Sequence, residues 1–483
     1  VELTRSLTEE GFPHFPVKRL SLDFVTLIEY ASHLRVKVAF PPPERLRLTL
    51  TEVITRTGRR VVKISESEKA AHVGFFLNGK QEAPFPGERR VVVPSPSGDV
   101  SYALRPEMSA AEVGREIRNA LEDQDADLIV ANLANVDVVG HLDNREAVLA
   151  AVEAVDGVLG RAAEAAAAGG ATLVVTADHG TVEDWLYDDG SVNTGHTRSR
   201  VPFLLADFRF PRPEVVRLSS VGELADAAPT VLGLMGIPAP GEMTGKSLVE
   251  GGAEKPAGRS RVLLLILDGW GMREEERGNM IAQARTPNFD RLWSLYPHAL
   301  LDASGEAVGL PAGTVGNSEA GHMHLGAGRR VPLDRVRIDR ALEDGRFASN
   351  PVLGEVMDGV LRRQRALHLM GIVSHYSSHG TLRHLFALLR LARDRGLERV
   401  FVHGFIGRRG ELPESGAVYV EKVEEECLRL GCGRLVTVMG RFWSLDREEN
   451  WDRVRRAYEA IVFGRGSVVR TRQASRPRPG RST

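Results

Sequence analysis

Short apolar runs that end directly in acidic or histidine residues restrict the fold of this chain more than any other feature. The run at 171–177 reads ATLVVTA and leads into Asp178 and His179, and the run at 261–267 reads RVLLLIL and leads into Asp268. Such runs alternate with helical patterns, for example at 145–168. This alternation predicts strand–helix units of an α/β fold with a buried parallel sheet. Open α/β sheets bind ligands at the carboxyl ends of their strands, where these side chains fall.

Length, charge and cysteine content limit the class of protein. A chain of 483 residues is longer than one core usually organises, so we expect two domains. Because 63 Lys and Arg balance 64 Asp and Glu, we expect small-molecule partners and no nucleic acid. The longest apolar stretch, 262–267, is far below the roughly 20 residues that span a bilayer, and no secretory signal is evident, so we expect a cytoplasmic protein without a membrane partner. Cys427 and Cys432 are expected to be reduced packing residues.

Five short segments carry side chains that bind hard metal ions. They read NVDVVGH at 135–141, TADHG at 176–180, TGHT at 194–197, LDGWG at 267–271 and GNSEAGH at 316–322. Their carboxylate, imidazole and hydroxyl groups, without a competing thiolate, suffice for a two-metal phosphoryl-transfer centre. The candidate ligands are Asp137, His141, Asp178, His179, His196, Asp268 and Ser318.

Each of these motifs has a simpler explanation when it is taken alone. Asp137 and His141 are four residues apart, so one helical turn would place them on one face, but such pairs are common on solvated helices. A strand-end Asp-His pair can equally cap a helix. Ser318 follows Gly316 in a glycine-rich loop, where it would be a metal-activated nucleophile or merely an N-cap with Glu319 in the first turn. Only the combination of segments favours a metal centre.

The same segments resemble the metal and nucleophile motifs of the alkaline phosphatase superfamily. The resemblance is closest to the 2,3-bisphosphoglycerate-independent phosphoglycerate mutase family. It extends over almost the whole chain through GLPAGTVGNSEAGHMHLGAGR, ALHLMG, VAFPP, SESEKAAHVGFFLNG, PFPGERRVVVPSP and PEMSAAEV. It implies an α/β fold with an alkaline-phosphatase-like metal domain and a second α/β substrate (transferase) domain.

The resemblance also implies an activity and a role for each candidate residue. It implies that 3-phosphoglycerate and 2-phosphoglycerate, intermediates of glycolysis and gluconeogenesis, are interconverted through a phosphoserine at Ser318 by a monomer that needs no 2,3-bisphosphoglycerate. One Mn²⁺ would be held by Asp137, His141 and His196, and the other by Asp178, His179, Asp268 and Ser318. Zn²⁺ and Co²⁺ also suit these ligand types. The phosphoglycerate would be bound by Lys69, His379, Arg409, Arg441 and Arg447.

The order of the motifs differs from that of the family. The LDGWG strand lies near the start of the family's chains and the DHG segment near the end, whereas here the DHG half comes first. We therefore predict a circular permutation joined through the polar, Gly- and Pro-bearing linker 250–260. The predicted metal domain spans 44–334, and the predicted substrate domain spans 335–469 plus 1–43. The basic tail 470–483 has no core-forming pattern and is predicted to be disordered.

The predicted substrate domain also departs from the family in its motifs. The family's FRxDR loop, which holds substrate phosphate, has no clear equivalent. SDGGVHSH of the family reads SHYSSHGT at 374–381, and GRD reads RRG at 408–410, so a carboxylate expected to assist proton transfer is replaced. Loss of a general acid or base lowers a rate by about 10²–10⁴. Two alternatives to an efficient mutase therefore stay open, a metal-dependent phosphohydrolase of the same superfamily and a non-catalytic or incomplete remnant.

Overall fold

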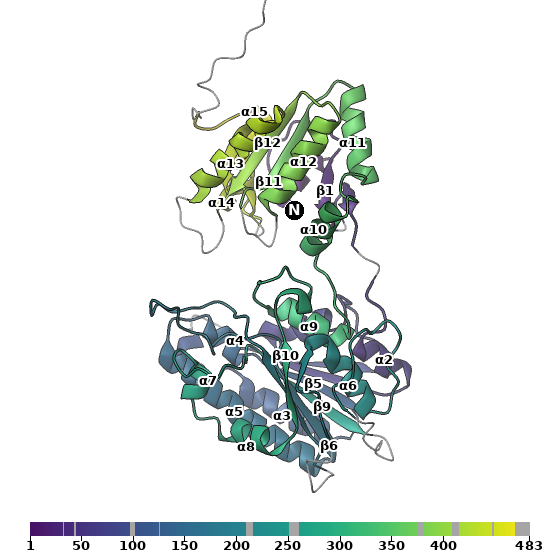
Figure 1. The fold of residues 1–483 in the computed structure, drawn as a ribbon, viewed down its shortest axis with the longest axis vertical. Helices are drawn as coiled ribbons and strands as arrows, with labels where there is room; N and C mark the ends of the chain where they lie inside the picture. The colour runs from purple at the N-terminus through teal and green to yellow at the C-terminus, as the bar shows by residue number, and fades with distance from the viewer. Residues whose placement is uncertain are drawn as a thin grey trace, which may run out of the picture. The chain divides into compact units, whose positions relative to one another are not determined.

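The chain divides into two compact units, one of Val1–Pro42 with Asp334–Thr483 and one of Pro43–Leu333 (Figure 1). The computed structural model describes residues 1–31, 33–42, 45–96, 102–124, 126–208, 216–250, 260–374, 380–407, 415–446 and 449–468. Each unit has a hydrophobic core of its own. Only Glu250 and Ser260 of the predicted linker are among the described residues, and the predicted tail 470–483 lies outside them.

The larger unit, Pro43–Leu333, is built on an eight-stranded sheet. The strand order is β4-β3-β5-β9-β6-β7-β10-β8. The bounds are β3 Val61–Glu66, β4 Glu88–Val93, β5 Leu128–Leu133, β6 Ala171–Thr176, β7 Val201–Ala206, β8 Val221–Glu223, β9 Arg261–Leu267 and β10 His298–Asp302. Strands β4, β3, β5, β9 and β6 are parallel, whereas β7 is antiparallel to both β6 and β10. The predicted α/β class is confirmed.

The central strands of this sheet are buried on both faces, as their continuous apolar sequences require. Every residue of β5 and β6, and every residue of β9 after Arg261, is buried. Strands covered on both sides need near-continuous apolar runs, and these are the runs that the sequence shows. Because β9 lies between β5 and β6, the two halves of the sequence that carry the ligand motifs meet in the middle of one sheet.

Helices cover both faces of this sheet (Figure 1). Helices α3 (Ala110–Glu122), α5 (Arg145–Ala168) and α8 (Pro287–Leu295) lie on one face, and α2 (Leu50–Arg56), α6 (Ala227–Leu234) and α9 (Ser318–Ala327) lie on the other. The unit also contains α4 (Asn135–Gly140) and α7 (Met280–Gln283). The helix predicted at 145–168 is confirmed, and it stops before Gly170, whose φ of +64° is easy only for glycine.

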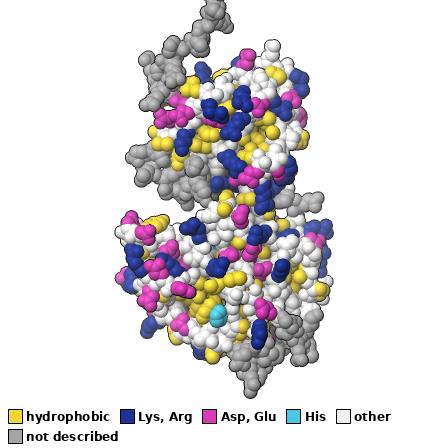
Figure 2. All heavy atoms as spheres, viewed as in Figure 1, with side chains coloured by type: hydrophobic (Ala, Val, Ile, Leu, Met, Phe, Trp, Pro, Cys, Tyr) yellow, Lys and Arg dark blue, Asp and Glu magenta, His cyan; other side chains and the backbone are white. Residues whose placement is uncertain are grey.

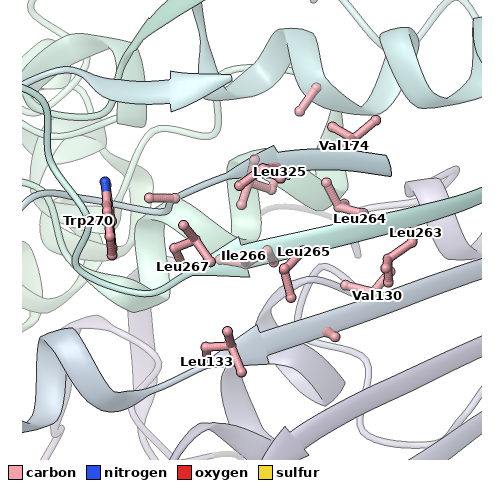
Figure 3. Close-up of a cluster of buried hydrophobic side chains, with 14 of the residues drawn as sticks. Val130, Leu133, Val174, Leu263, Leu264, Leu265, Ile266, Leu267, Trp270 and Leu325 are labelled. Atoms are coloured by element: carbon pink, nitrogen blue, oxygen red, sulfur yellow. The ribbon is translucent and has the colours of Figure 1, made fainter. Parts of the chain in front are cut away.

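A continuous apolar cluster lies below the carboxyl ends of the central strands (Figure 3). It contains Val130 of β5, Val174 of β6 and Leu263 to Leu267 of β9, all at most 1% exposed. Trp270, which lies in the loop after β9, and Leu325, which lies in α9, belong to the same cluster and are fully buried. Each fully buried side chain of this kind contributes about 1.5–3 kcal/mol to stability. The strand ends that carry the ligand motifs are therefore held in place by a well-packed apolar core.

The smaller unit contains two separate parallel sheets. One has the order β11-β12-β13 and the other pairs β1 with β2. The strands are β1 Val25–Ile28, β2 Lys37–Phe40, β11 Leu367–Ile372, β12 Val400–Ile406 and β13 Arg434–Gly440. The helices are α1 Glu2–Thr8, α10 Asp334–Glu343, α11 Pro351–Arg362, α12 Leu382–Asp394, α13 Ser415–Leu430, α14 Arg441–Ser444 and α15 Trp451–Phe463. Cys427 and Cys432 are free and buried.

The surface of the larger unit mixes both signs of charge. On the face shown in Figure 2, acidic and basic side chains of the described residues are interspersed over this unit. None of the helices among the described residues is long and apolar enough to cross a membrane.

Candidate metal centre

Three neighbouring strands deliver the acidic residues to one place. Asp137 lies in α4 just after β5, Asp178 follows β6, and Asp268 follows β9. Because β5, β9 and β6 are adjacent and parallel, their carboxyl ends meet at one edge of the sheet. His196 comes from the loop before β7, and Ser318 is the first residue of α9. The sequence expectation that these segments would converge agrees with this arrangement.

One group of side chains surrounds the Oδ1 atom of Asp137. The Nε2 atoms of His196, His141 and His179 lie 3.1, 3.3 and 3.7 Å from it. His141 and His196 each use Nδ1 to donate to a backbone carbonyl, of Thr194 at 2.7 Å and of Gly316 at 2.9 Å respectively. A carbonyl only accepts, so in each neutral ring Nδ1 carries the hydrogen and Nε2 keeps a lone pair on the side of Asp137. Asp137 Oδ1 is buried and has no hydrogen-bond donor among the described residues.

A second group surrounds the hydroxyl of Ser318. His179 Nε2 lies 2.9 Å from Ser318 Oγ, 3.4 Å from Asp178 Oδ2 and 3.6 Å from the nearest oxygen of Asp268. Asp178 is oriented through Oδ1, which accepts from the backbone N–H of Gly269 at 3.2 Å and of His179 at 3.1 Å. Its Oδ2 is buried without a hydrogen bond from the described residues. His179 therefore borders both groups and not only the second one.

Lys69 places its ammonium in the middle of these residues. Its Nζ donates to Asp137 Oδ2 at 2.7 Å, to Asp268 Oδ1 at 2.6 Å and to Ser318 Oγ at 2.7 Å. The side chain is 5% exposed. The resemblance assigned Lys69 to the substrate, and the structure shows it in direct contact with the candidate nucleophile and two candidate ligands.

Burial and charge set the protonation states at this site. Burial raises the pKa of Asp268 to about 6, and the nearby Asp178 adds to this effect. Burial also acts on Asp137, but the Lys69 ammonium outweighs it and holds the pKa of Asp137 well below its ordinary value. Burial lowers the pKa of His179 to about 4, so this imidazole is neutral at neutral pH.

The residues present fit a pair of divalent cations. Three buried carboxylates, of Asp137, Asp178 and Asp268, face one ammonium, so the site carries excess negative charge out of water. Buried charge of this kind is stable only when it is paired or bound to metal. One unpaired carboxylate oxygen lies in each group, on Asp137 and on Asp178. Ligand atoms within 4.8 Å of one another occur in two sets, Asp137 with His179 and His196, and Asp178 with Asp268 and His322.

The candidate nucleophile opens a helix without capping it. The N-cap of α9 is Asn317, whose side chain accepts from Ala320 N, so the alternative of Ser318 as an N-cap is wrong. The Ser318 hydroxyl accepts from Lys69 and lies 2.9 Å from His179 Nε2. His179 Nδ1 lies 3.2 Å from the carbonyl of Gly180, and in the tautomer that donates to this carbonyl Nε2 can accept the hydroxyl proton. The positive end of the α9 helix dipole also favours an anion here.

Glycines let the backbone of these loops approach closely. A Cβ at Gly321 would lie 2.4 Å from the carbonyl oxygen of Asp178, and a Cβ at Gly316 would lie 2.2 Å from that of Ala303. Gly269, at φ +82°, would place a Cβ 2.9 Å from the Asp137 backbone. Larger residues at these positions would push the ligand loops apart.

Sequence reasoning missed three buried polar residues around the centre. Glu183 accepts from the backbone N–H of Thr181 at 2.9 Å and from the hydroxyl of Thr197, and so ties the loop after β6 to the loop that carries His196. Asn132 and His322 contact each other and the candidate ligands. A polar residue inside the apolar run of β5 was the available signal for Asn132. Neither Glu183 nor His322 stands out from its neighbours by spacing.

Most of the predicted substrate residues cannot be placed. His379, Arg409 and Arg447 lie outside the described residues. Arg441 begins α14 at the carboxyl end of β13 in the smaller unit. Its Cγ would lie 3.8 Å from a Cβ at Gly407, the residue that follows β12. Arg441 therefore lies at the carboxyl ends of two neighbouring parallel strands, a usual position for ligand binding.

Comparison with known families matches both parts of the chain. Residues 12–239 match the Metalloenzyme superfamily. Residues 338–477 match the family described as BPG-independent PGAM N-terminus (iPGM_N). The domain named for an N-terminus thus matches the C-terminal part of this chain.

Several relatives carry the same name. The 2,3-bisphosphoglycerate-independent phosphoglycerate mutase of Myxococcus xanthus is 51% identical over 206 residues, which are 43% of this chain and 40% of that protein. The protein of that name from Moorella thermoacetica is 49% identical over 216 residues, 45% of this chain and 41% of its own length. The chain therefore spans about two fifths of the length of these relatives. A crystal structure of Leishmania mexicana phosphoglycerate mutase at low cobalt concentration is 26% identical, with a TM-score of 0.42 over 51% of this chain and 47% of that one. Over the parts that these comparisons match, the chain is therefore similar to the Metalloenzyme superfamily and to 2,3-bisphosphoglycerate-independent phosphoglycerate mutases.

Proposed function

We propose that this chain interconverts 3-phosphoglycerate and 2-phosphoglycerate through a phosphoserine at Ser318. The observation that carries the proposal is the setting of the Ser318 hydroxyl, which lies 2.7 Å from the Lys69 ammonium, 2.9 Å from His179 and 3.4 Å from Asp268. The family supplies the substrate class. We further propose that the enzyme acts as a cytoplasmic monomer in glycolysis and gluconeogenesis.

The proposed cofactors are two divalent ions, with manganese as the first choice. One would be held by Asp137, His141 and His196, and the other by Asp178, His179, Asp268 and Ser318. When bound, they would lower the pKa of the serine hydroxyl and neutralise phosphate oxygens. The carboxylate and imidazole donors suit Mn²⁺, and Zn²⁺ and Co²⁺ fit the same donors.

The chain's own groups provide the remaining electrostatic help. Lys69 donates to Ser318 Oγ at 2.7 Å, so its charge favours the alkoxide and the phosphoryl group that arrives there. The backbone N–H groups at the start of α9 add donors for phosphate oxygens. Transfer to Ser318 breaks the phosphate ester of the substrate and leaves glycerate, whose other hydroxyl then takes the phosphoryl group back.

Glycerate must be retained between the two transfers. We propose that Arg409, Arg441, Arg447 and His379 bind it, because guanidinium groups pair with carboxylate and phosphate through two parallel hydrogen bonds. Water must be excluded at this stage, or the phosphoserine hydrolyses.

The test follows the phosphoryl group from substrate to protein. Purified protein with MnCl₂ and 3-phosphoglycerate should form 2-phosphoglycerate, and mass spectrometry of an acid-quenched reaction should find phosphate on Ser318. Ser318→Ala should lower turnover by roughly 10⁴-fold or more. Ser294→Ala is the control, because Ser294 Oγ is exposed and donates to the carbonyl of Arg291. Full turnover by Ser318→Ala would refute the proposal.

A metal-dependent phosphohydrolase is the second candidate function. The sequence RRG at 408–410 in place of GRD, and SHYS at 374–377 in place of SDGG, favour it because both changes fall in the predicted substrate domain while the metal motifs are intact. If glycerate escapes, water can hydrolyse the phosphoserine. Inorganic phosphate released from 3-phosphoglycerate should then exceed the 2-phosphoglycerate formed; mutase turnover without phosphate release would exclude this function.

A further inference from the structure

Asn132 is a fully buried polar residue of β5 that lies against the metal centre without being one of its predicted ligands. Its Nδ2 lies 2.7 Å from Asp268 Oδ2 and 3.0 Å from His322 Nε2. A buried amide inside an apolar strand destabilises a fold unless its hydrogen bonds compensate. The contacts of the Asn132 amide with Asp268 and with His322 therefore decide together whether its burial is tolerated.

His322 fixes which way the Asn132 amide faces. His322 Nδ1 lies 2.9 Å from the backbone carbonyl of Ser318. A carbonyl only accepts, so Nδ1 carries the hydrogen, and in the neutral ring Nε2 then carries a lone pair. That lone pair takes one N–H of Asn132, and the carboxylate of Asp268 takes the other. The reversed amide would place its oxygen against a lone pair and a carboxylate, so the observed orientation is favoured.

The same hydrogen bonds decide what His322 does. Asp178, Asp268 and His322 bring ligand atoms within 4.8 Å of one another, and His322 Nδ1 lies 3.2 Å from Asp178 Oδ2, so His322 has the position of a possible ligand. A ligand nitrogen needs a free lone pair, and both ring nitrogens are already engaged, Nδ1 as a donor and Nε2 as an acceptor.

We infer, on the basis of the proposed two-metal function, that Asn132 is a positioning residue for Asp268 and that His322 orients Asn132 without binding metal itself. Asn132 holds Oδ2 of Asp268, and this leaves Oδ1 facing Lys69 at 2.6 Å and Ser318 Oγ at 3.4 Å. Asn132 therefore fixes Oδ2 of Asp268, while Oδ1 of the same carboxylate faces the nucleophile Ser318. Loss of such an outer partner lowers metal affinity by about 10–100-fold.

Calorimetric titration of the purified chain with MnCl₂ tests these roles. Asn132→Leu and His322→Leu should each leave two Mn²⁺ bound and weaken one of them by about 10–100-fold. His322→Gln should bring that affinity back to within a few-fold of wild type, because the glutamine oxygen can accept from Asn132 in place of Nε2. The readout is metal affinity and stoichiometry, so it does not depend on turnover.

His324 offers a matched control on the same helix. It is as buried as His322, its Nδ1 donates to the carbonyl of Ala320 at 2.7 Å, and its Nε2 accepts from Val331 N at 2.9 Å. His324→Leu should lower the melting temperature and leave Mn²⁺ affinity unchanged. Equal loss of affinity in the His322→Leu and His324→Leu variants would show a merely structural role and overturn the inference.

Other outcomes separate this inference from the proposed reaction. Binding of a single Mn²⁺ by both His322 variants would make His322 a ligand, and unchanged affinity in Asn132→Leu would remove its positioning role; either result overturns the inference. Wild-type protein that binds two Mn²⁺ but forms no 2-phosphoglycerate would refute the reaction alone, with the roles of Asn132 and His322 still decided by the affinities. Wild-type binding of fewer than two Mn²⁺ would overturn both.

Discussion

Two polar networks, one in each unit, differ in charge. In the larger unit, Lys69 and three carboxylates are gathered at the carboxyl ends of neighbouring strands, so the buried groups are charged. In the smaller unit, the buried His403 links two less buried side chains across three parallel strands, with His403 Nε2 2.9 Å from His368 Nδ1 and His403 Nδ1 2.7 Å from Thr437 Oγ1. This second network is neutral and complete without any ion. From this difference we expect bound cations to stabilise the larger unit more than the smaller one.

The largest expected effect comes from removing the lysine charge. Lys69→Met would leave three buried carboxylates without their ammonium, so in metal-free protein the larger unit should lose about 3–5 kcal/mol. Mn²⁺ should recover part of this loss. Hydrogen exchange followed by mass spectrometry would resolve the two units. Lys37→Met is the control, since its ion pair with Glu355 in the smaller unit is exposed and should contribute little to stability. Similar losses in both variants would contradict the comparison.

Lowering the pH should destabilise the smaller unit through its neutral histidine network. Burial lowers the pKa of His403 from 6.5 to about 4, so the folded state binds a proton less readily than the unfolded state. The stability from this group is present above pH 6.5 and is lost as the pH falls toward 4, by about 3 kcal/mol in all. His403→Gln, which cannot titrate, should flatten this loss in β11 to β13. Hydrogen exchange at several pH values measures it, and an unchanged pH dependence in the variant would assign the loss to other groups.

Addition of metal should act on one unit only. A ligand present at 100 times its dissociation constant stabilises the state that binds it by about 2.7 kcal/mol. Mn²⁺ should therefore slow hydrogen exchange in β5, β6 and β9 and leave β11 to β13 unchanged, and chelation with EDTA should reverse the effect. Equal protection of both units would show that the dependence on cations is not confined to the metal centre.

Two helical glycines, one in each unit, test the comparison with the smallest expected change in stability. Gly321 and Gly354 both lie in helices, α9 and α11, where alanine is normally favoured by up to about 1 kcal/mol. A Cβ at Gly321 would meet the backbone of Asp178 at 2.4 Å, whereas at Gly354 it would meet the guanidinium end of Arg395 at 3.1 Å. We expect Gly321→Ala to destabilise by about 1–3 kcal/mol and to weaken Mn²⁺ binding. Gly354→Ala should be neutral or stabilising; urea unfolding and manganese titration test both.

The sequence predicts the strands that carry the site better than the side-chain contacts within it. Apolar runs that end in Asp or His predicted β6 and β9, because strand burial and strand-end chemistry are both apparent in the local sequence. The position of the Lys69 ammonium on the Ser318 hydroxyl depends on how distant segments pack, which spacing does not encode. His322 of α9 was overlooked for the same reason, since only its contact with Asn132 of β5 reveals its role.

The place of β9 in the sheet has a consequence for biosynthesis. This strand forms the middle of the sheet, yet both of its neighbours, β5 and β6, precede it in the chain. On the ribosome these two apolar strands emerge with their shared partner still untranslated, so each exposes an unpaired edge until residue 267 has left the exit tunnel. Nascent chains should therefore engage chaperones over this interval and acquire protease resistance abruptly once β9 is available.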